Sequence, residues 1–549
     1  MNEREGRLKR ATFFFLHLPF RSSVPMRRFF ILILTLVLIP GMRLSAQKQG
    51  GNGDMDKPLR VEIQARSVNE TYRVIPCGTN GLILFFRSQE ITSDARTNWY
   101  FTCYDTNFQQ KWVKSVLLFS DQDFRFKEIG QDTLVLLFVH TGKSKDPENP
   151  IEILRVSLRN GTMILNTGKL ENGSTVDFFG LEKGRAWLGV NMRSLAGKIM
   201  TIELKHGINR VFPLGTGSQL AIHWLKPDTA SVTVSAIVSR QISKKIMEYY
   251  LVRYDTSGLI KREVLIGMQN GERAITQVRV VTSNNGSELL VGSYGLGLTT
   301  TSQKNSPVLD ESTGFFSSQV KGGVVQTTNF YNFLELKNVN SIVGENDIIN
   351  LKKKALKKKK SLSEYSLDYS VLMHDVIEKD GFLTVAAEFY TPQYHTESFT
   401  DFDFYGRPYT NSYSVFDGYR FFNTVVAGFD LEGKLLWDNF IEMRNLVSFE
   451  LSPKVVIYPS GADLVLGYIS DGKIGSRIIQ AGNVVEKLDF SALDMLNPDD
   501  KLTAESKGSL IYWYGPYFLS SGYQEIKNIA LESNNKRFVF YFSKLKFEK

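Results

Sequence analysis

The chain has 549 residues, of which 42% are hydrophobic and 12% aromatic. This composition argues against a disordered chain and supplies enough apolar surface for a large core. The formal net charge is +9, but eight basic and two acidic residues among residues 1–46 contribute +6, which leaves only +3 for the rest. The near-neutral remainder argues against nucleic acid as a partner, because nucleic-acid-binding proteins carry an extended basic surface.

The N-terminal residues 1–46 have the pattern of a secretory signal peptide. Two arginines precede an apolar run, residues 29–40, and small residues follow it. The run is shorter than the roughly 20 residues that span a bilayer. We therefore expect cleavage near Ala46 and an exported protein, either periplasmic or extracellular. Met26 is an alternative start that would give a signal of ordinary length, and an uncleaved anchor is the other interpretation of the run.

The two cysteines are expected to be buried free thiols. Export would permit a disulfide. Cys77 is predicted to end one strand and Cys103 to lie two strands away, with the strand 82–87 between them. Alternate strands of a sheet lie about 9–10 Å apart, which is too far for a disulfide.

Short runs of apolar, β-branched and aromatic residues recur along the chain, each after a polar turn. Most neighbours are separated by roughly 50 residues, the period of a four-stranded propeller blade. Strand-like runs at this spacing, with turns between them, predict an all-β protein. The runs are residues 81–86, 132–138, 184–190, 231–238, 287–292, 381–387, 462–467 and 509–513.

We therefore predict a single β-propeller over residues 59–549, of about seven four-stranded blades, with eight as the alternative. Two spacings between runs are too long and indicate insertions at about 297–378 and 391–424, expected as loops on one face of the ring. Residues 47–58 have the composition of a flexible lead-in.

The two ends of the propeller each contain a predicted strand. Residues 59–63 follow the lead-in, and residues 537–542 lie close to the C-terminus. Pairing between them would close the ring and remove the exposed sheet edges.

A turn motif follows several of the runs. It has an Asp, two further residues, then Gly or Asn, and a strand after it; examples begin at Asp105, Asp255 and Asp430, and residues 157–161 are a degraded copy. The Asp is expected to accept hydrogen bonds within the turn, and Gly or Asn to supply the positive φ. The strand that follows would return to the edge of the sheet.

The segment from Asp430 to Trp437 resembles the turns of propellers with pyrroloquinoline-quinone-type repeats. In that class, a vicinal cysteine pair and a metal site imply a quinone-dependent dehydrogenase, whereas non-catalytic members are scaffolds for partner proteins. This chain has no adjacent cysteines, so no cofactor is expected. The chain as a whole is similar to exported propeller-like proteins of Gram-negative bacteria, which implies location and fold only.

The insertion at 391–424 is rich in aromatic residues interleaved with Asp and Arg. Such rings would stack on sugars or peptides while the tyrosine hydroxyl groups find polar partners. The alternative is that the rings pack the insertion onto the propeller as a satellite core. The candidate ligand-binding residues are Phe402, Phe404, Tyr405, Arg407, Tyr409, Tyr413 and Tyr419.

The insertion at 297–378 contains seven closely spaced lysines. With the apolar residues around them they would form a basic amphipathic helix that binds anionic lipid or an acidic polymer. A solvated loop is the alternative. The lysines are Lys352, Lys353, Lys354, Lys357, Lys358, Lys359 and Lys360.

No catalytic or metal-binding motif stands out. The pairs Asp121 with Asp123 and Asp401 with Asp403 lack the rest of a calcium loop. The histidines have no metal spacing and no G-x-S-x-G motif occurs. Glu388 lies in a strong strand, where it would be a general acid or, as we prefer, a paired structural group.

The sequence therefore predicts an exported, non-catalytic binding or scaffold protein. Its loops would present a surface to a polysaccharide, a peptide or an envelope protein, and peripheral contact with an anionic membrane is a further option. The alternative is a carbohydrate-active hydrolase or lyase whose acids, supplied by different blades, meet in the central channel without leaving a local motif. The sequence indicates no oligomeric state.

Overall fold

The structure is a computed structural model, and all of its described residues lie within Asp54–Lys549. The expected signal peptide and lead-in, residues 1–58, lie outside the described residues. Description runs from residue 59 to residue 547 with gaps at 68–69, 142–146, 193–196, 215–217, 229–232, 244–245, 269–272, 284–285, 297–310, 339–348, most of 351–368, and 531–535.

The described residues form eight antiparallel sheets, of which seven have four strands and one has six. The all-β propeller with seven four-stranded blades is thereby confirmed, and the six-stranded sheet is an eighth member of the ring. The first four sheets contain β2 (Arg73–Pro76), β3 (Leu82–Ile91), β4 (Arg96–Tyr104) and β5 (Gln110–Phe119); β6 (Gln122–Ile129), β7 (Thr133–His140), β8 (Glu148–Ser157) and β9 (Met163–Glu171); β10 (Ser174–Glu182), β11 (Arg185–Met192), β12 (Lys198–Glu203) and β13 (Ile208–Pro213); and β14 (Ser218–Asp228), β15 (Thr233–Ser243), β16 (Ile246–Asp255) and β17 (Ile260–Ile266).

The last four sheets include the six-stranded one and the sheet that joins the two ends of the chain. They contain β18 (Arg273–Thr282), β19 (Glu288–Leu296), β21 (Gly314–Lys321) and β22 (Val324–Asn332); β20 (Glu311–Ser312), β23 (Tyr369–Met373), β24 (Ile377–Lys379), β25 (Phe382–Phe402), β26 (Pro408–Asp430) and β27 (Leu435–Ser448); β28 (Val456–Ser460), β29 (Asp463–Ser470), β30 (Lys473–Gln480) and β31 (Asn483–Ala492); and β32 (Asp500–Tyr514), β33 (Tyr517–Asn528), β34 (Lys536–Lys546) and β1 (Arg60–Gln64).

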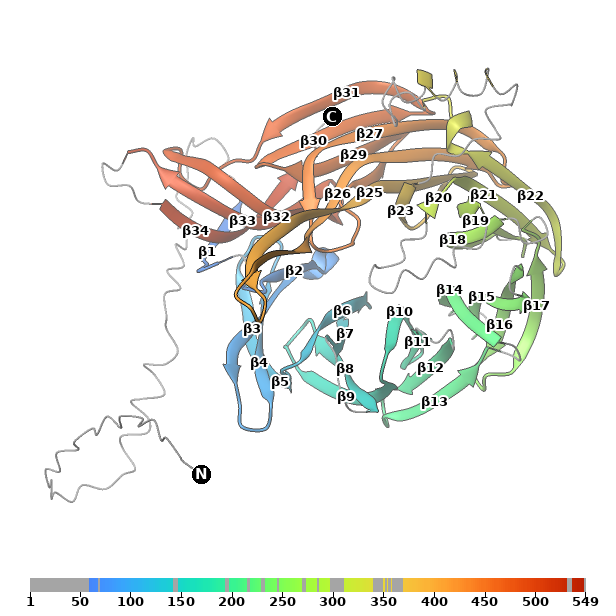
Figure 1. Ribbon diagram of the computed structural model, residues 1–549, viewed down its shortest axis with the longest axis horizontal. Helices are drawn as coiled ribbons and strands as arrows, with labels where there is room; N and C mark the ends of the chain where they lie inside the picture. Colours follow the sequence, from blue (N-terminus) through green and yellow to red (C-terminus); the bar gives the residue numbers. More distant parts are fainter. Residues whose placement is uncertain are drawn as a thin grey trace, which may run out of the picture. The chain divides into compact units, whose positions relative to one another are not determined.

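The sheets follow one another around a common centre, and the first strand lies innermost in sheets such as β10–β13, β14–β17 and β18-β19-β21-β22 (Figure 1). First strands of neighbouring sheets contact one another: β6 contacts β10, β10 contacts β14, β14 contacts β18, and β32 contacts both β28 and β2. The contact between β32 and β2 brings the last sheet beside the first and completes the ring.

The ring is closed by pairing between the two ends of the propeller, as the sequence predicted. β1 pairs with β34 in antiparallel register, with Val61 opposite Phe542. The N-terminal strand is therefore the outermost strand of the last sheet, in the order β1-β34-β33-β32. This arrangement covers an edge of β34 that would otherwise be exposed.

The hydrophobic core of the described chain is divided into clusters that lie between neighbouring sheets. The cluster between the first two sheets contains Phe85, Trp99 and Phe138, all fully buried. The smallest cluster lies between the seventh and the last sheet, and its buried residues are Ile469, Leu493 and Tyr541. Burial of apolar surface is the main driving force of folding, so this junction receives less of it than the others.

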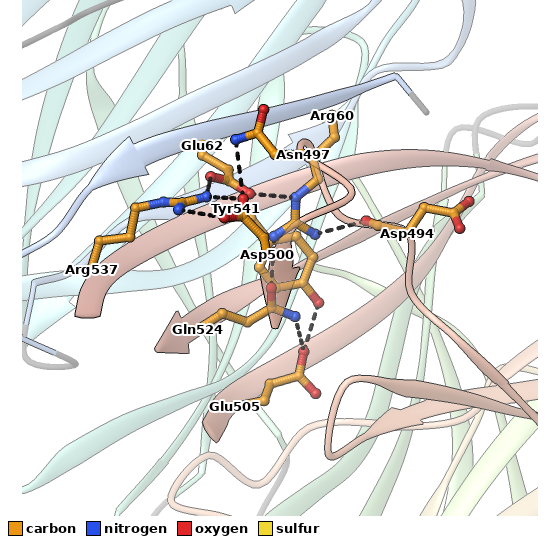
Figure 2. A network of polar contacts seen from close by, with 9 residues as sticks. All are labelled: Arg60, Glu62, Asp494, Asn497, Asp500, Glu505, Gln524, Arg537 and Tyr541. Atoms are coloured by element: carbon orange, nitrogen blue, oxygen red, sulfur yellow. Dashed lines mark hydrogen bonds and ion pairs between the residues drawn. The ribbon is translucent and has the colours of Figure 1, made fainter. Parts of the chain in front are cut away.

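A polar network surrounds Tyr541 at that junction (Figure 2). The Arg60 side chain is fully buried; its Nε donates to Glu62 at 2.8 Å and its Nη2 to Gln524 at 2.6 Å. The guanidinium carbon lies 4.3 Å from the centre of the Tyr541 ring, and the Tyr541 hydroxyl donates to Glu505 at 2.8 Å. The network thus links β1 to the other three strands of the last sheet.

Arg537, on β34, occupies the other half of this network (Figure 2). Its Nη2 donates to Glu62 at 2.9 Å, and its Nη1 donates to Asp500 at 2.9 Å. The Asp500 side chain is fully buried and also accepts from Asn528. These hydrogen bonds, that from Arg537 above all, hold the pKa of Asp500 below its usual range.

The eight runs found in the sequence fall in eight different sheets. Six of them coincide with the second strand of a four-stranded sheet, from β3 in the first sheet to β29 in the seventh, and the run 381–387 falls on β25, the third strand in the order of the six-stranded sheet. Only the run 509–513 falls on a first strand, β32. Second strands are buried on both faces between neighbouring sheets, which explains their continuous apolar character.

The turn motif also has the predicted chemistry. In the turns that begin at Asp105, Asp255 and Asp430, Oδ1 accepts from the backbone N–H groups two and four residues later. The strand after each turn, β5, β17 or β27, is an edge strand as expected. One detail was wrong: in the first of these turns the positive φ belongs to Phe108 and not to the Asn before it.

The interval 297–378, expected as an insertion, contains strands of the ring. β21 and β22 are the third and fourth strands of the fifth sheet, and β23 belongs to the next sheet. The sequence hid these strands because their buried positions carry hydroxyl groups: Ser317 donates to the Gly433 carbonyl at 2.5 Å, and Ser318 lies 3.1 Å from Thr328. A search for apolar runs therefore passes over them.

Candidate functional site

Two neighbouring strands of the six-stranded sheet, β25 and β26, continue well beyond it. β25 has 21 residues and β26 has 23. Within the described chain, residues 393–402 and 408–418 pair only with each other. We call residues 393–418 the hairpin extension. The expected insertion at 391–424 is thus a continuation of two strands and not a loop, because its aromatic, Thr and Ser residues favour β structure.

The turn at the end of the hairpin extension is built around Asp403. Its Oδ1 accepts from the N–H groups of Tyr405 and Arg407, both at 2.9 Å, and Gly406 has a φ of +73°. The side chains of Phe404 and Tyr405 are 97% and 80% exposed. A rigid turn therefore holds two aromatic rings out into solvent.

Cross-strand partners in an antiparallel pair share a face, so the register divides the extension into two faces. One face carries hydroxyl groups and the other combines carboxylates with aromatic rings. The hydroxyl face has Thr396, Ser398, Thr400, Thr410, Ser412 and Ser414 along its middle, with Tyr394 and Phe416 at one end and Phe402 and Pro408 at the other. The acidic–aromatic face consists of His395, Glu397, Phe399, Asp401, Tyr409, Asn411, Tyr413 and Val415.

Hydrogen bonds order the acidic–aromatic face. The Tyr409 hydroxyl donates to Asp401 at 3.2 Å, and the Tyr413 hydroxyl donates to Glu397. The rings of Phe399 and Tyr413 meet edge to face with centres 6.1 Å apart. All three rings are between 44% and 51% exposed, so their outer surfaces remain open to a ligand while the carboxylates fix the orientation of the two tyrosines.

His395 lies at the base of this face between two carboxylates. Its Nδ1 is 2.6 Å from Asp417, and its Nε2 is 3.3 Å from Glu397. Only the protonated imidazole can donate from both nitrogens. Accordingly, the hydrogen bond to Asp417, followed by that to Glu397, raises the pKa of His395.

The structure gathers six of the seven predicted ligand-binding residues in the extension. Phe402, Phe404, Tyr405, Tyr409 and Tyr413 are exposed there, together with Arg407. The satellite-core alternative is wrong for these residues.

At the base of the extension that alternative is right, and it applies to the seventh residue. Tyr419 is half-buried, with ring centres 5.5 Å from Tyr390 and 5.0 Å from Phe416. Glu397 and Phe399 also belong to this surface but were not among the predicted ligand-binding residues. The alternation of polar and aromatic residues along this strand is the signal that would have identified them.

The seven candidate lysines fall almost entirely outside the described residues. Of them only Lys353 and Lys357 are described, and both are exposed. Where the structure describes the chain, no helix is long and apolar enough to cross a membrane.

The carboxylate and histidine candidates have structural partners. Asp121 lies 2.9 Å from Nδ1 of His140, and Asp123 lies 3.7 Å from Arg73. Within the described ranges, no three of the His, Cys, Asp and Glu side chains are grouped as metal ligands. Both cysteines are free and buried, as expected, and burial raises the pKa of Cys77 to about 12.

Glu388 is a fully buried structural acceptor. It accepts from the backbone N–H groups of Lys454 and Val455, at 2.8 Å and 2.7 Å, and lies 2.8 Å from Nε2 of His374. The preferred interpretation of Glu388 as a paired structural group is confirmed. These hydrogen bonds connect the residues just before β28, the first strand of the seventh sheet, to β25.

A second carboxyl group, that of Glu128, has a raised pKa. Glu128 lies on β6, a first strand; burial raises its pKa, nearby Asp375 raises it further, and Lys226 lowers it. A carboxyl group with a raised pKa is suited to general acid catalysis.

His223 gives the ring a pH-dependent stability. Its Nε2 lies 2.9 Å from the Ser239 hydroxyl, and burial lowers its pKa to about 4. The unfolded chain binds a proton near pH 6.5, so the unfolded state holds more protons between pH 6.5 and 4 and stability falls as the pH is lowered. We expect this residue to account for a loss of about 3 kcal/mol over that range.

Urea unfolding at a series of pH values measures the effect, and His223→Gln is the comparison because glutamine keeps a hydrogen-bonding side chain without the titration. The variant should lose clearly less stability than the wild type between pH 6.5 and 4. Equal losses would show that His223 does not carry this pH dependence.

Comparisons with known proteins support no family assignment. No family model matches the chain, and no curated protein matches it. Among solved structures, the chain is similar to polysaccharide lyase Uly1, with 8% identity over 77% of this chain and 89% of that one and a TM-score of 0.36. The periplasmic gluconolactonase PpgL of Pseudomonas aeruginosa is 11% identical over 77% of this chain and 99% of its own, with a TM-score of 0.37.

The WD40 domain of SCAP from fission yeast is similar at 10% identity, over 89% of this chain and 97% of that one, with a TM-score of 0.36. At such low scores the likenesses carry no argument about activity. The propeller architecture rests on the strand pairing of this chain itself.

Proposed function

We propose that this chain is an exported binding protein whose recognition element is the hairpin extension. The observation that carries the proposal is the exposure of Phe404 and Tyr405, 97% and 80%, on a turn fixed by Asp403. Large aromatic rings held in solvent by an ordered turn are typical of interaction sites, where they supply contact area at a low entropic cost. The closed ring serves as the scaffold.

Three partner classes fit this element: a polysaccharide, a peptide and an envelope protein. The test screens residues 47–549 against a glycan array and an envelope extract, with captured proteins identified by mass spectrometry. The double variant Phe404→Ser/Tyr405→Ser should lose at least about 90% of the specific capture, because interface energy concentrates in a few aromatic anchors. Its thermal unfolding should match the wild type, since neither ring packs in the core.

Ile91→Ser is the matched control. Ile91 ends β3 next to another hairpin turn and is 66% exposed, so its replacement also removes an exposed apolar side chain. Capture unaffected by the double variant would overturn the proposal. A polysaccharide that is shortened during the screen would favour the alternative, a hydrolase or lyase in the central channel, for which Glu128 is the candidate acid.

A further inference from the structure

The hairpin extension leaves a long strand edge without a partner. In the described chain, β23 covers the edge of β25 only opposite residues 387–390, and β24 only opposite residues 382–384. Beyond them, residues 393–402 pair on one side alone. Natural proteins protect such edges with lysines, prolines or very short strands. The extension contains no lysine and only one proline, Pro408, which lies on β26.

The turn geometry determines which backbone groups face this edge. The N–H of Asp403 donates to the Arg407 carbonyl at 3.0 Å, so residues 403 and 407 form a hydrogen-bonded pair. Hydrogen-bonded and non-hydrogen-bonded pairs alternate along antiparallel strands. The N–H and C=O groups of residues 394, 396, 398 and 400 therefore point away from β26, toward the free edge of β25. Those of Phe402 point the same way, but its N–H already donates to Oδ1 of Asp401 at 2.9 Å.

The same alternation determines which side chains of β25 would lie beside an added strand. Residues with outward backbone groups have side chains on the hydroxyl face, whereas Glu397, Phe399 and Asp401 project from the acidic–aromatic face. The extension has four carboxylates and one arginine. Basic side chains on an added strand would lie directly beside the carboxylates and the exposed rings, where ion pairing and cation–π contacts are both favourable.

We propose that the free edge of β25 binds an extended basic peptide by antiparallel strand addition, in line with β23. This inference rests on the proposed function and names the class of partner. Main-chain hydrogen bonds from residues 394–402 supply affinity, and alternate basic side chains beside Glu397 and Asp401 supply specificity. Small Ser or Thr side chains of the peptide would lie over the hydroxyl face.

The probe is the blocked octapeptide (Thr-Lys)4 with a fluorescent label, and fluorescence anisotropy with residues 47–549 measures its dissociation constant. Two N-methylated forms provide the internal control. Methylation of the Thr nitrogens removes the donors that face β25 and should weaken binding by at least about tenfold, because each buried hydrogen bond to an acceptor is lost. Methylation of the Lys nitrogens removes donors that face solvent and should change little.

The chain offers a matched pair of variants. Ser398 and Ser412 lie opposite each other in the register, and both have outward backbone groups. Proline is tolerated on an edge where its missing N–H faces solvent. Ser398→Pro should therefore weaken peptide binding at least about tenfold by blocking the β25 edge, whereas Ser412→Pro, on the β26 edge, should bind as the wild type does. Replacing Lys by Glu in the peptide should abolish binding.

Equal binding of the two N-methylated peptides, or equal binding by the Ser398→Pro and Ser412→Pro variants, would overturn strand addition. Failure of the wild type to bind (Thr-Lys)4 would also overturn it. If the Phe404→Ser/Tyr405→Ser variant still loses its captured partner in that case, the proposed function stands and only the basic peptide is wrong. If capture is independent of the extension, both proposals fail.

Discussion

Replacing Arg537 with methionine is expected to lower the free energy of unfolding by about 3–5 kcal/mol. Methionine keeps much of the apolar stem but leaves Asp500 and Glu62 without their shared cation. The Asp500 side chain is fully buried, so its carboxylate loses its counter-charge away from water, whereas Glu62, 8% exposed, keeps its ion pair with Arg60. Removing one partner of a buried pair is costly for this reason, even where the intact pair contributes little net stability.

Urea unfolding at pH 7 measures this loss, with Lys536→Met as the control. Lys536 is the neighbouring residue and pairs with Glu525, but its side chain is 51% exposed, so the control should lose no more than about 1 kcal/mol. A loss of that size in Arg537→Met would contradict a stabilising role for the network.

The pH dependence provides a second check on the same residue. Arg537 lowers the pKa of Asp500 in the folded state, so the stability this adds is present above the unfolded pKa and is lost as the pH falls through the folded one. The difference between wild type and Arg537→Met should therefore shrink below about pH 4.

Replacing Glu388 with alanine should cost a similar amount, about 3–5 kcal/mol. The change leaves the N–H groups of Lys454 and Val455 and the ring of His374 without their acceptor in a buried place. Because Glu388 fastens the start of the seventh sheet to β25, hydrogen exchange at residues 454–455 should accelerate more than exchange elsewhere in the ring.

The control for this variant is Glu378→Ala, which removes an exposed carboxylate from β24 and should change stability by less than about 0.5 kcal/mol. Glu388→Gln keeps one acceptor oxygen and should lie between the two. A Glu388→Ala variant as stable as the control would show that water replaces the lost acceptor.

Much of the ring could be predicted because most of its second strands are recognisable in the sequence. Residues 132–138 and 462–467 are continuous apolar runs since both of their faces are covered, and the Asp turns at Asp105 and Asp255 mark the way back to an edge strand. The pairing of β1 with β34 followed from the physical need to cover two edges. The third and fourth strands of the fifth sheet were not predicted, because Ser317 and Ser318 occupy core positions there and hydrogen-bond to the Gly433 carbonyl and the Thr328 hydroxyl.

The sequence predicted most of the residues of the candidate site but not the extended hairpin that presents them. The sequence shows where aromatic residues concentrate, but the choice between a packed and an exposed insertion depends on tertiary contacts. Tyr419 packs against Tyr390, whereas Tyr405 projects from the turn, and no local feature of the sequence separates the two. The free edge of β25 was likewise hidden, since pairing partners are not encoded in the strand itself.

The position of β1 also constrains how this ring can assemble. β1 cannot form its native pairing until β34, near the other end of the chain, has been synthesised, because Arg60 lies opposite Ser543. Contacts so distant along the chain pay a large loop-closure entropy and form slowly. Seven sheets can form in order while the last sheet stays incomplete, so we expect the capture of the N-terminal strand to be the last step of folding. Until that moment the edge of β34 is a site for mispairing between copies, so a chain shortened at either end should accumulate as an aggregation-prone open ring.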